Sequence, residues 1–129
     1  MSEHDDRLYL SHVAEAIAHI ERSVGGEEAK FLGDVDVRDA TLRRLHTIAE
    51  STQRLSPELK ARHPEMPWSD VAAFRNRIVH GYLAVDLGRA WAVVERDLPP
   101  LAALVRRELG IERTVGREQD RDLGREAGR

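Results

Sequence analysis

The stretch RLYLSHVAEAIAHIERSVGG, residues 7–26, has the residue spacing of an amphipathic helix. Its apolar residues Val13, Ile17, Ile20 and Val24 recur every three or four positions and therefore share one face of an α-helix. The two glycines at the end of the stretch are typical helix stops. We therefore predict a first helix over about residues 7–24 with one buried face.

The same period continues downstream, and capping residues mark its boundaries. A short amphipathic stretch spans residues 27–32, after which Asp34 or Asp36 can cap a longer helix. The sequence Ser56-Pro57-Glu58 predicts the start of a short helix, which stops near residues 63–64. The longer helix between them is predicted to present one inner face: Val37, Thr41, Leu45, Ile48, Thr52 and Leu55.

Two more helices complete the pattern. One is predicted over residues 67–80 and stopped by Gly81, and the other is capped by Asp86 and runs to about residue 109. Pro99 and Pro100 fall inside the apolar stripe of the last helix, so we expect a kink there. That stripe consists of Leu87, Trp91, Val94, Leu98, Leu101, Val105 and Leu109. No segment alternates as a strand does, which predicts an all-α bundle of four to five helices.

The 129 residues suit a single helical domain, which we place at residues 1–111. Residues 112–129 are nearly all Arg, Glu, Asp and Gly, and such a composition cannot form a core. We therefore predict a charged, disordered tail over residues 112–129.

Composition excludes several classes of function. The chain has no cysteine, which rules out disulfides, thiolate metal sites and cysteine nucleophiles. No apolar run approaches the roughly 20 residues that a membrane span needs, and residues 1–7 are too acidic and polar for a secretory signal. We therefore expect a soluble, cytoplasmic protein with no membrane partner.

The charge balance limits any contact with nucleic acid to a local site. The net charge is −3, whereas a protein that grips a long nucleic acid is usually basic. Of the 20 basic residues, 18 are arginine, which favours bidentate contacts to carboxylate or phosphate, although a GC-rich genome would produce the same bias.

Candidate functional residues concentrate in FRNRIVHGY, residues 74–82. Arg75 falls in the middle of the apolar arc of its predicted helix, where a charge is costly unless it has a partner or lies in a cleft. Asn76 and Arg77 share a face with His80, because they precede it by four and three residues. Arg75 and His80 lie roughly 140° apart around a straight helix, so they converge only if the chain turns at Gly81 or if two chains meet.

Arginine and histidine without a carboxylate cluster suit metal-free cleavage of RNA. The imidazole of His80 can take a proton from a ribose 2′-hydroxyl or give one to the leaving oxygen, while Arg75 holds the phosphate. Asn76 can orient either group, and Arg77 is a further candidate RNA contact. The nucleophile belongs to the substrate, so neither a metal nor a cofactor is expected.

Structural alternatives exist for each of these residues. Arg75 could form an ion pair with Asp70 or Glu50, His80 could be an ordinary residue at a helix end, and Tyr82 a half-buried aromatic. The same Arg–His spacing also occurs at Arg7 and His12. We interpret that second match as a coincidence, because no asparagine follows the arginine and no glycine follows the histidine. The histidines at positions 12, 19 and 46 are interpreted as face or cap residues.

The longer string Arg75-Asn76-Arg77-Ile78-Val79-His80-Gly81-Tyr82 resembles the signature of the HEPN superfamily, and most of all its HepT-like toxins. Their pattern is Arg, four residues, His, any residue, Tyr, with a polar residue after the Arg. The similarity covers about residues 7–110 and includes Trp68, Val85-Asp86, Trp91, Asp97-Leu98-Pro99 and Arg43-Arg44-Leu45 before Ala49-Glu50. The family usually has Gly-Glu-Ala where this chain has Ala49-Glu50-Ser51.

The resemblance implies a homodimeric all-α bundle in which Arg75 and His80, assisted by Asn76, cleave RNA such as tRNA or mRNA without a metal. It implies a partner, a minimal nucleotidyltransferase antitoxin encoded beside the toxin. It also implies that this partner transfers AMP from ATP to Tyr82 and so blocks the cleft with negative charge. The alternative is a non-catalytic HEPN-like binding or adaptor module that partners a nucleotidyltransferase.

Overall fold

The computed structural model describes residues 3–81 and 86–111, and within these ranges every regular element is helical. The predicted fold class is therefore confirmed. Both the predicted tail and Tyr82 lie outside the described residues. The elements are α1 (Glu3–Val24), α2 (Glu28–Gly33), α3 (Val35–Gln53), α4 (Pro57–Ala61), α5 (Trp68–Gly81), α6 (Leu87–Ala92), a π-helical turn η2 (Val93–Asp97) and α7 (Leu98–Leu109).

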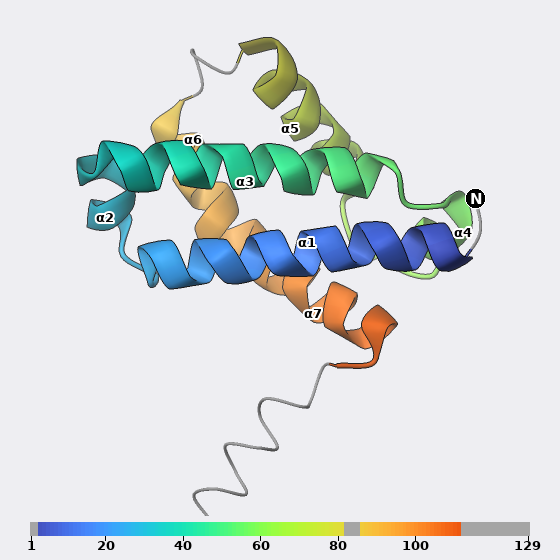
Figure 1. Cartoon of the computed structure of the whole chain (residues 1–129). Coiled ribbons are helices and arrows are strands. Elements are labelled where there is room, and N and C mark those ends of the chain that lie inside the picture. The colour runs from blue at the N-terminus through green and yellow to red at the C-terminus, as the bar shows by residue number, and fades with distance from the viewer. Residues whose placement is uncertain (1–2, 82–85, 112–129) are drawn as a thin grey trace, which may run out of the picture.

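Helices α1 and α3 form a long antiparallel pair at the centre of the fold (Figure 1). Helix α5 leans against α3, while α6, η2 and α7 form a rod that crosses behind the pair (Figure 1). The first helix starts four residues earlier than the apolar stripe predicts, at Glu3 rather than Arg7.

Two contacts at the open end of the pair fix the register of α1 against α3. The buried carboxylate of Asp6 accepts hydrogen bonds from the backbone N–H of Ser56, at 2.8 Å, and from its hydroxyl, at 2.6 Å. One turn further along α1, the guanidinium of Arg54 lies over the ring of Tyr9, 5.9 Å from its centre. Both donors of Ser56 are thus satisfied in a buried position, where an unpaired polar group would be costly.

The predicted caps form where the sequence places them. Asp34, rather than Asp36, caps α3, because its carboxylate accepts from the N–H groups of the second and third residues of the turn. The hydroxyl of Ser56 caps α4, and the carboxylate of Asp86 caps α6. Gly25 ends the first helix with a positive φ of 54°, a conformation that favours glycine.

The core lies between α1, α3 and α7, and it contains the predicted apolar stripes. Phe31 from α2 and Trp91 from α6 pack against each other there, with ring centres 5.8 Å apart. The most deeply buried large side chains include Leu10, Val13, Ile17, Ile20, Val24, Leu45, Leu59, Leu104 and Val105. Burial of such side chains is the main favourable contribution to folding.

The expected proline kink takes another form. Pro99 and Pro100 occupy the first turn of α7, and the preceding turn η2 is π-helical. A proline has no N–H to donate to the preceding turn, and the first turn of a new helix is where that loss is tolerated. The irregularity therefore begins one turn before the prolines, at Val93, and not at the prolines themselves.

A charged cluster fixes the loop that leads into α5. The imidazole of His63, only 9% exposed, lies between Glu65, at 3.3 Å, and Glu108 near the end of α7, at 2.5 Å. Glu108 also pairs with Arg62 at 2.9 Å. The hydrogen bond from Arg62, and then that from His63, hold the pKa of Glu108 below its ordinary value of 4.5, against the opposing effect of its partial burial. This cluster joins the start of α5 to the carboxyl end of the rod.

Glu108→Gln is expected to lower the free energy of unfolding at pH 7 by about 1–2 kcal/mol, because it removes charge-assisted hydrogen bonds. A carboxyl whose pKa is lowered by folding stabilises the protein above its unfolded pKa and loses that effect as the pH falls through the folded pKa. The gap between wild type and variant should therefore narrow below about pH 4.5. Urea unfolding at pH 7 and at pH 3 measures this gap. A gap of equal size at both pH values would contradict the assignment.

Candidate active site

Helix α5 carries four of the predicted site residues on one continuous element. It runs from Trp68 to Gly81, one residue later at each end than the prediction of 67–80. Its start is fixed by Trp68, whose indole N–H donates to the carbonyls of Lys60, at 3.2 Å, and His63, at 3.1 Å. The positions of the side chains along α5 are therefore set by the loop that precedes it.

Arg75 has the partner that a guanidinium in an apolar arc requires. Its Nε donates to a carboxylate oxygen of Glu50 on α3 at 2.7 Å. Both side chains are about one-third exposed, at 31% and 32%. Of the two ion-pair partners that the sequence suggested, Glu50 is the one that the structure pairs with Arg75.

The two outer nitrogens of the Arg75 guanidinium, Nη1 and Nη2, are the donors that could bind a phosphate. Its Nη1 donates to the amide oxygen of Asn76 at 3.1 Å, and no residue in the described ranges accepts from its Nη2. A guanidinium held through Nε keeps its outer nitrogens in a fixed plane, which suits two-pronged binding of a phosphate. Asn76 thus contacts Arg75, and its role in orienting that group stays a prediction.

His46, which the sequence analysis interprets as a face or cap residue, is a further neighbour of the Arg75–Glu50 pair. It lies one turn before Glu50 on α3, and its Nε2 is 3.9 Å from the carboxylate oxygen that binds Arg75. A histidine and a glutamate four residues apart share one helix face, so this spacing was the signal that could have identified the pair. Glu50 therefore connects a cation on α5 to an imidazole on α3.

Three predictions for the site are not settled by these contacts. His80 lies within the last turn of α5, but its side chain and the whole of Tyr82 lie outside the described residues. Arg77 is exposed and does not contact Glu50 in the way that Arg75 does. The structure therefore brings Arg75, Asn76 and Glu50 together, and Arg77 is not part of this set of hydrogen bonds.

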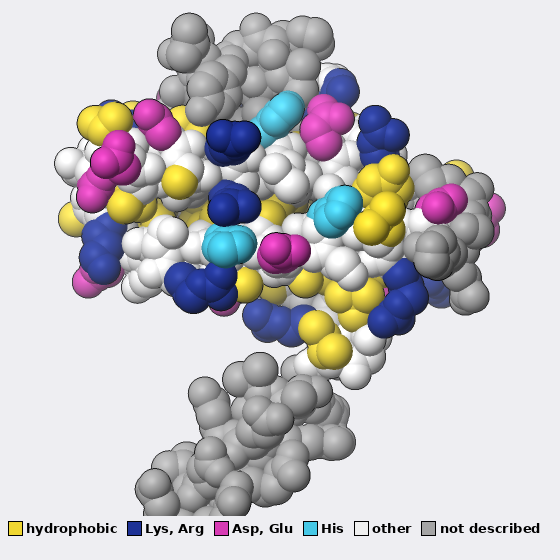
Figure 2. All heavy atoms as spheres, viewed as in Figure 1, with side chains coloured by type: hydrophobic (Ala, Val, Ile, Leu, Met, Phe, Trp, Pro, Cys, Tyr) yellow, Lys and Arg dark blue, Asp and Glu magenta, His cyan; other side chains and the backbone are white. Residues whose placement is uncertain are grey.

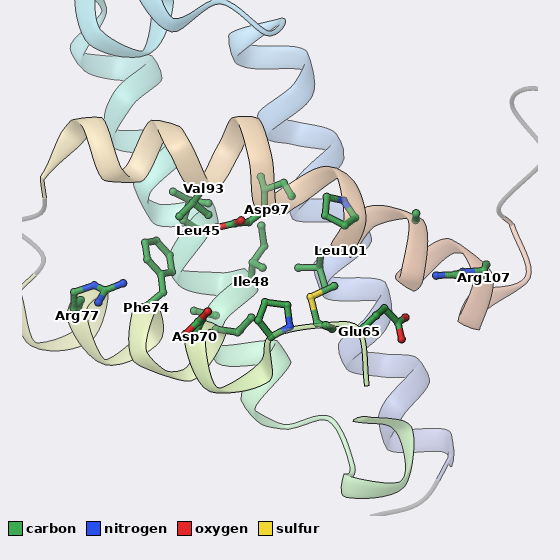
Figure 3. Close-up of a pocket in the computed structure, with 17 residues that line it drawn as sticks. Leu45, Ile48, Glu65, Asp70, Phe74, Arg77, Val93, Asp97, Leu101 and Arg107 are labelled. Carbon is green, nitrogen blue, oxygen red and sulfur yellow. The ribbon is translucent and has the colours of Figure 1, made fainter. Parts of the chain in front are cut away.

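Arg77 instead borders an apolar crevice of about 540 Å³ between α3, α5 and the η2–α7 segment. Figure 3 shows Phe74 pointing from α5 toward Val93, with Leu45 and Ile48 of α3 alongside. Acidic and basic side chains, among them Asp70 and Arg107, stand at its edges (Figure 3). The crevice lies on the side of α5 that carries Phe74 and Arg77.

The described part of the chain offers no preformed metal site and no membrane span. Within residues 3–81 and 86–111, no group of three or more His, Asp or Glu side chains is arranged to hold a metal ion. None of the helices in the same ranges is both long and apolar enough to cross a membrane.

Comparison with known proteins identifies the family. The family model described as "Ribonuclease HepT-like" matches residues 13–108, so this chain belongs to the HepT-like ribonuclease family. The match includes α5 and the Glu50 region of α3, the two elements that build the candidate site.

Several curated proteins are similar to the chain. One is the "Probable ribonuclease HepT" of Thermococcus cleftensis, 36% identical over 96 residues that cover 72% of this chain and 86% of that protein. A "Putative RNase" of Caldanaerobacter subterraneus is 29% identical over 83% of this chain and 96% of its own length. A "Gamma-glutamylcyclotransferase and putative RNase" of Methanocaldococcus jannaschii is 34% identical over 75% of this chain, which spans only 44% of that longer protein. No solved structure gives a significant match.

The Arg75–Glu50 pair predicts a defect in RNA cleavage when Glu50 is changed. Glu50→Gln keeps the size of the side chain but weakens the hold on Nε, so we expect cleavage to slow by about 10- to 100-fold through loss of positioning. A pair this exposed contributes at most about 1 kcal/mol to folding, so the unfolding midpoint should change little. Initial rates on a labelled RNA, with urea unfolding of the same preparations, test this.

Glu27→Gln is the matched control, because it also removes the carboxylate of an ion pair, that with Lys30 at 3.4 Å on the surface. It should leave cleavage unchanged. Equal rates for Glu50→Gln and Glu27→Gln would mean that the Arg75–Glu50 pair is structural only.

Proposed function

We propose that the chain is an endoribonuclease that cuts RNA without a metal ion, with Arg75 and His80 as catalytic residues and Asn76 assisting. The observation that carries the proposal is the guanidinium of Arg75, held by Glu50 and Asn76, whose Nη2 has no acceptor among the described residues. Membership of the HepT-like ribonuclease family supports the same reaction.

The reaction uses a nucleophile that RNA itself provides. The 2′-oxygen of a ribose attacks the adjacent phosphorus as its proton passes to a base, and the bond from phosphorus to the 5′-oxygen breaks as that oxygen gains a proton. The imidazole of His80 serves in one or both of these proton transfers, since histidine titrates near neutral pH. Arg75 binds the non-bridging phosphate oxygens and offsets the charge that develops on them.

Regulation by a partner is the second part of the proposal. The HepT-like family suggests a toxin–antitoxin pair in which a minimal nucleotidyltransferase silences the chain by transferring AMP to Tyr82. Tyr82 follows the α5 helix by one residue, so a phosphate attached there adds bulk and negative charge near the end of the element that carries Arg75. That charge would compete with the RNA phosphate for the same guanidinium.

Homodimerisation is the third part. Positions 75 and 80 are roughly 140° apart around a straight helix, and two chains that pack along α5 offer a way for Arg75 of one chain to meet His80 of the other. The apolar crevice beside Phe74 and Arg77 supports packing in this region, because a second chain would remove its apolar lining from water.

A cleavage assay in excess EDTA tests the catalytic proposal. The chain, made without any partner, should cut total RNA or purified tRNA, and Arg75→Ala and His80→Ala should each lower the rate by about 100-fold or more. Arg75→Lys, which keeps the charge but not the planar fork, should also be strongly impaired.

Arg7→Ala and His12→Ala are the matched controls, because they remove an arginine and a histidine with the same spacing from α1. They should cut at the wild-type rate. If the folded, unmodified chain cuts no RNA, the catalytic proposal fails and the non-catalytic partner module replaces it.

Co-expression with a small nucleotidyltransferase encoded beside the chain tests the modification. We expect the intact mass to rise by one or more adenylyl groups and RNA cleavage to stop. The sequence has only two tyrosines, so Tyr82→Phe should abolish the mass shift and Tyr9→Phe should not. A shift that persists in Tyr82→Phe would place the modification elsewhere.

A further inference from the structure

Basic side chains cross the face that α1 and α3 share. We call His19 and Arg22 of α1 together with Arg43 and Arg44 of α3 the cationic band. The three arginines are exposed, and His19 is partly exposed. In Figure 2, dark blue and cyan side chains form a column that crosses both helices toward the α5 region.

The register of the two helices brings His19 level with Arg43 and Arg44, and Arg22 lies about one turn further along α1. Asp6 contacts Ser56 at the open end of the pair. His19 follows Asp6 by as many residues as Arg43 precedes Ser56. Tyr9 contacts Arg54, and His19 follows Tyr9 by as many residues as Arg44 precedes Arg54, so His19 is also level with Arg44. Because α1 and α3 are antiparallel, His19 is therefore level with the two arginines of α3.

The band continues into the candidate active site. Arg43, His46 and Glu50 follow one another at intervals of three and four residues, so they form one stripe along α3. Glu50 at the end of this stripe binds Arg75 of α5. A polyanion bound at Arg75 can therefore extend over His46 and Arg43 without leaving the surface of α3.

Three arginines of the described residues pair with a glutamate, and the arginines of the band are not among them. Arg62, Arg75 and Arg106 each pair with a glutamate, whereas Arg43 and Arg44 pair with no carboxylate among the described residues. Arg22 instead donates to the ring of His19 at 2.9 Å. In a chain with a net charge of −3, the adjacent Arg43 and Arg44, which have no carboxylate partner among the described residues, create a local positive potential.

We propose that the cationic band binds the phosphates of a single RNA strand that runs from Arg75 across α3 and onto α1. This inference rests on the proposed function, because it names the path that the substrate takes from the cleavage site. Packed helices lie about 8–10 Å apart, so a band across two of them spans only a few phosphates. Phosphate contacts position a strand without reading its sequence, so the band sets where the RNA lies and not which bases are cut.

RNA binding by a chain that cannot cut provides the test. In a His80→Ala background, fluorescence anisotropy of a short labelled single-stranded RNA is measured over a range of salt concentrations. Arg43→Ala/Arg44→Ala should weaken binding by about fivefold or more and reduce the salt dependence of log K by roughly 1.4, or about 0.7 for each phosphate that is no longer neutralised. With His80 restored, the same pair of substitutions should raise KM and leave kcat unchanged.

Arg7→Ala/Arg96→Ala is the matched control. It also removes two exposed arginines, from the first turns of α1 and from η2, outside the band. Its affinity and salt slope should equal those of the parent. Because all four arginines are exposed, circular dichroism should show both double variants folded to the same extent.

The outcomes separate this inference from the proposed function. If the chain cuts RNA but Arg43→Ala/Arg44→Ala changes neither KM nor the salt slope, the inference is wrong and the proposed function stands. If RNA binding depends on the two arginines but no RNA is cut, the catalytic proposal fails alone. If the two arginines affect binding of the nucleotidyltransferase and not of RNA, the band is a protein-binding surface and the inference is overturned.

Discussion

The antiparallel packing of α1 against α3 is the constraint on which the rest of the structure depends. Helix α5 rests on α3, the α6–α7 rod crosses behind both, and the core lies between α1, α3 and α7. The hydrogen bonds from Ser56 to Asp6 close one end of the pair, and Gly25 turns the chain at the other. Since α3 carries Glu50, its position relative to α1 also fixes where the guanidinium of Arg75 is held.

The sequence predicted the helices well because capping residues and apolar periods are local signals. Asp34, Ser56 and Asp86 each bond the first turn of the helix that follows, so a few adjacent residues determine each boundary. The π-helical turn was not predicted, because two prolines indicate a disturbance in the helix but not the turn in which the chain absorbs it.

The candidate site was only partly predictable, since its central contact joins residues distant in the sequence. A charge at position 75 in an apolar arc indicated that a partner was needed, but two acids were equally available until the packing of α5 on α3 selected Glu50. His46 was overlooked for the same reason, because its relevance depends on Glu50 holding Arg75. The partly buried cluster of His63 and Glu108 also depends on elements far apart in the chain, and no local pattern indicates it.

The π-helical turn Val93–Asp97 also bears on how the chain can change in length. Such a turn contains one residue more than an α-helical turn does. The segment between α6 and α7 therefore holds one extra residue compared with a regular α-helix. Deleting one residue there would make the rod regular and leave α6 and α7 nearly in phase, because a π-helical turn and an α-helical turn both complete one full rotation. Trp91 would then stay buried against Phe31, and Leu101 and Val105 would stay in the core. The rod can therefore lose one residue in this turn and keep the same side chains in the core, whereas the same loss within α6 or α7 would rotate the helix by about 100°.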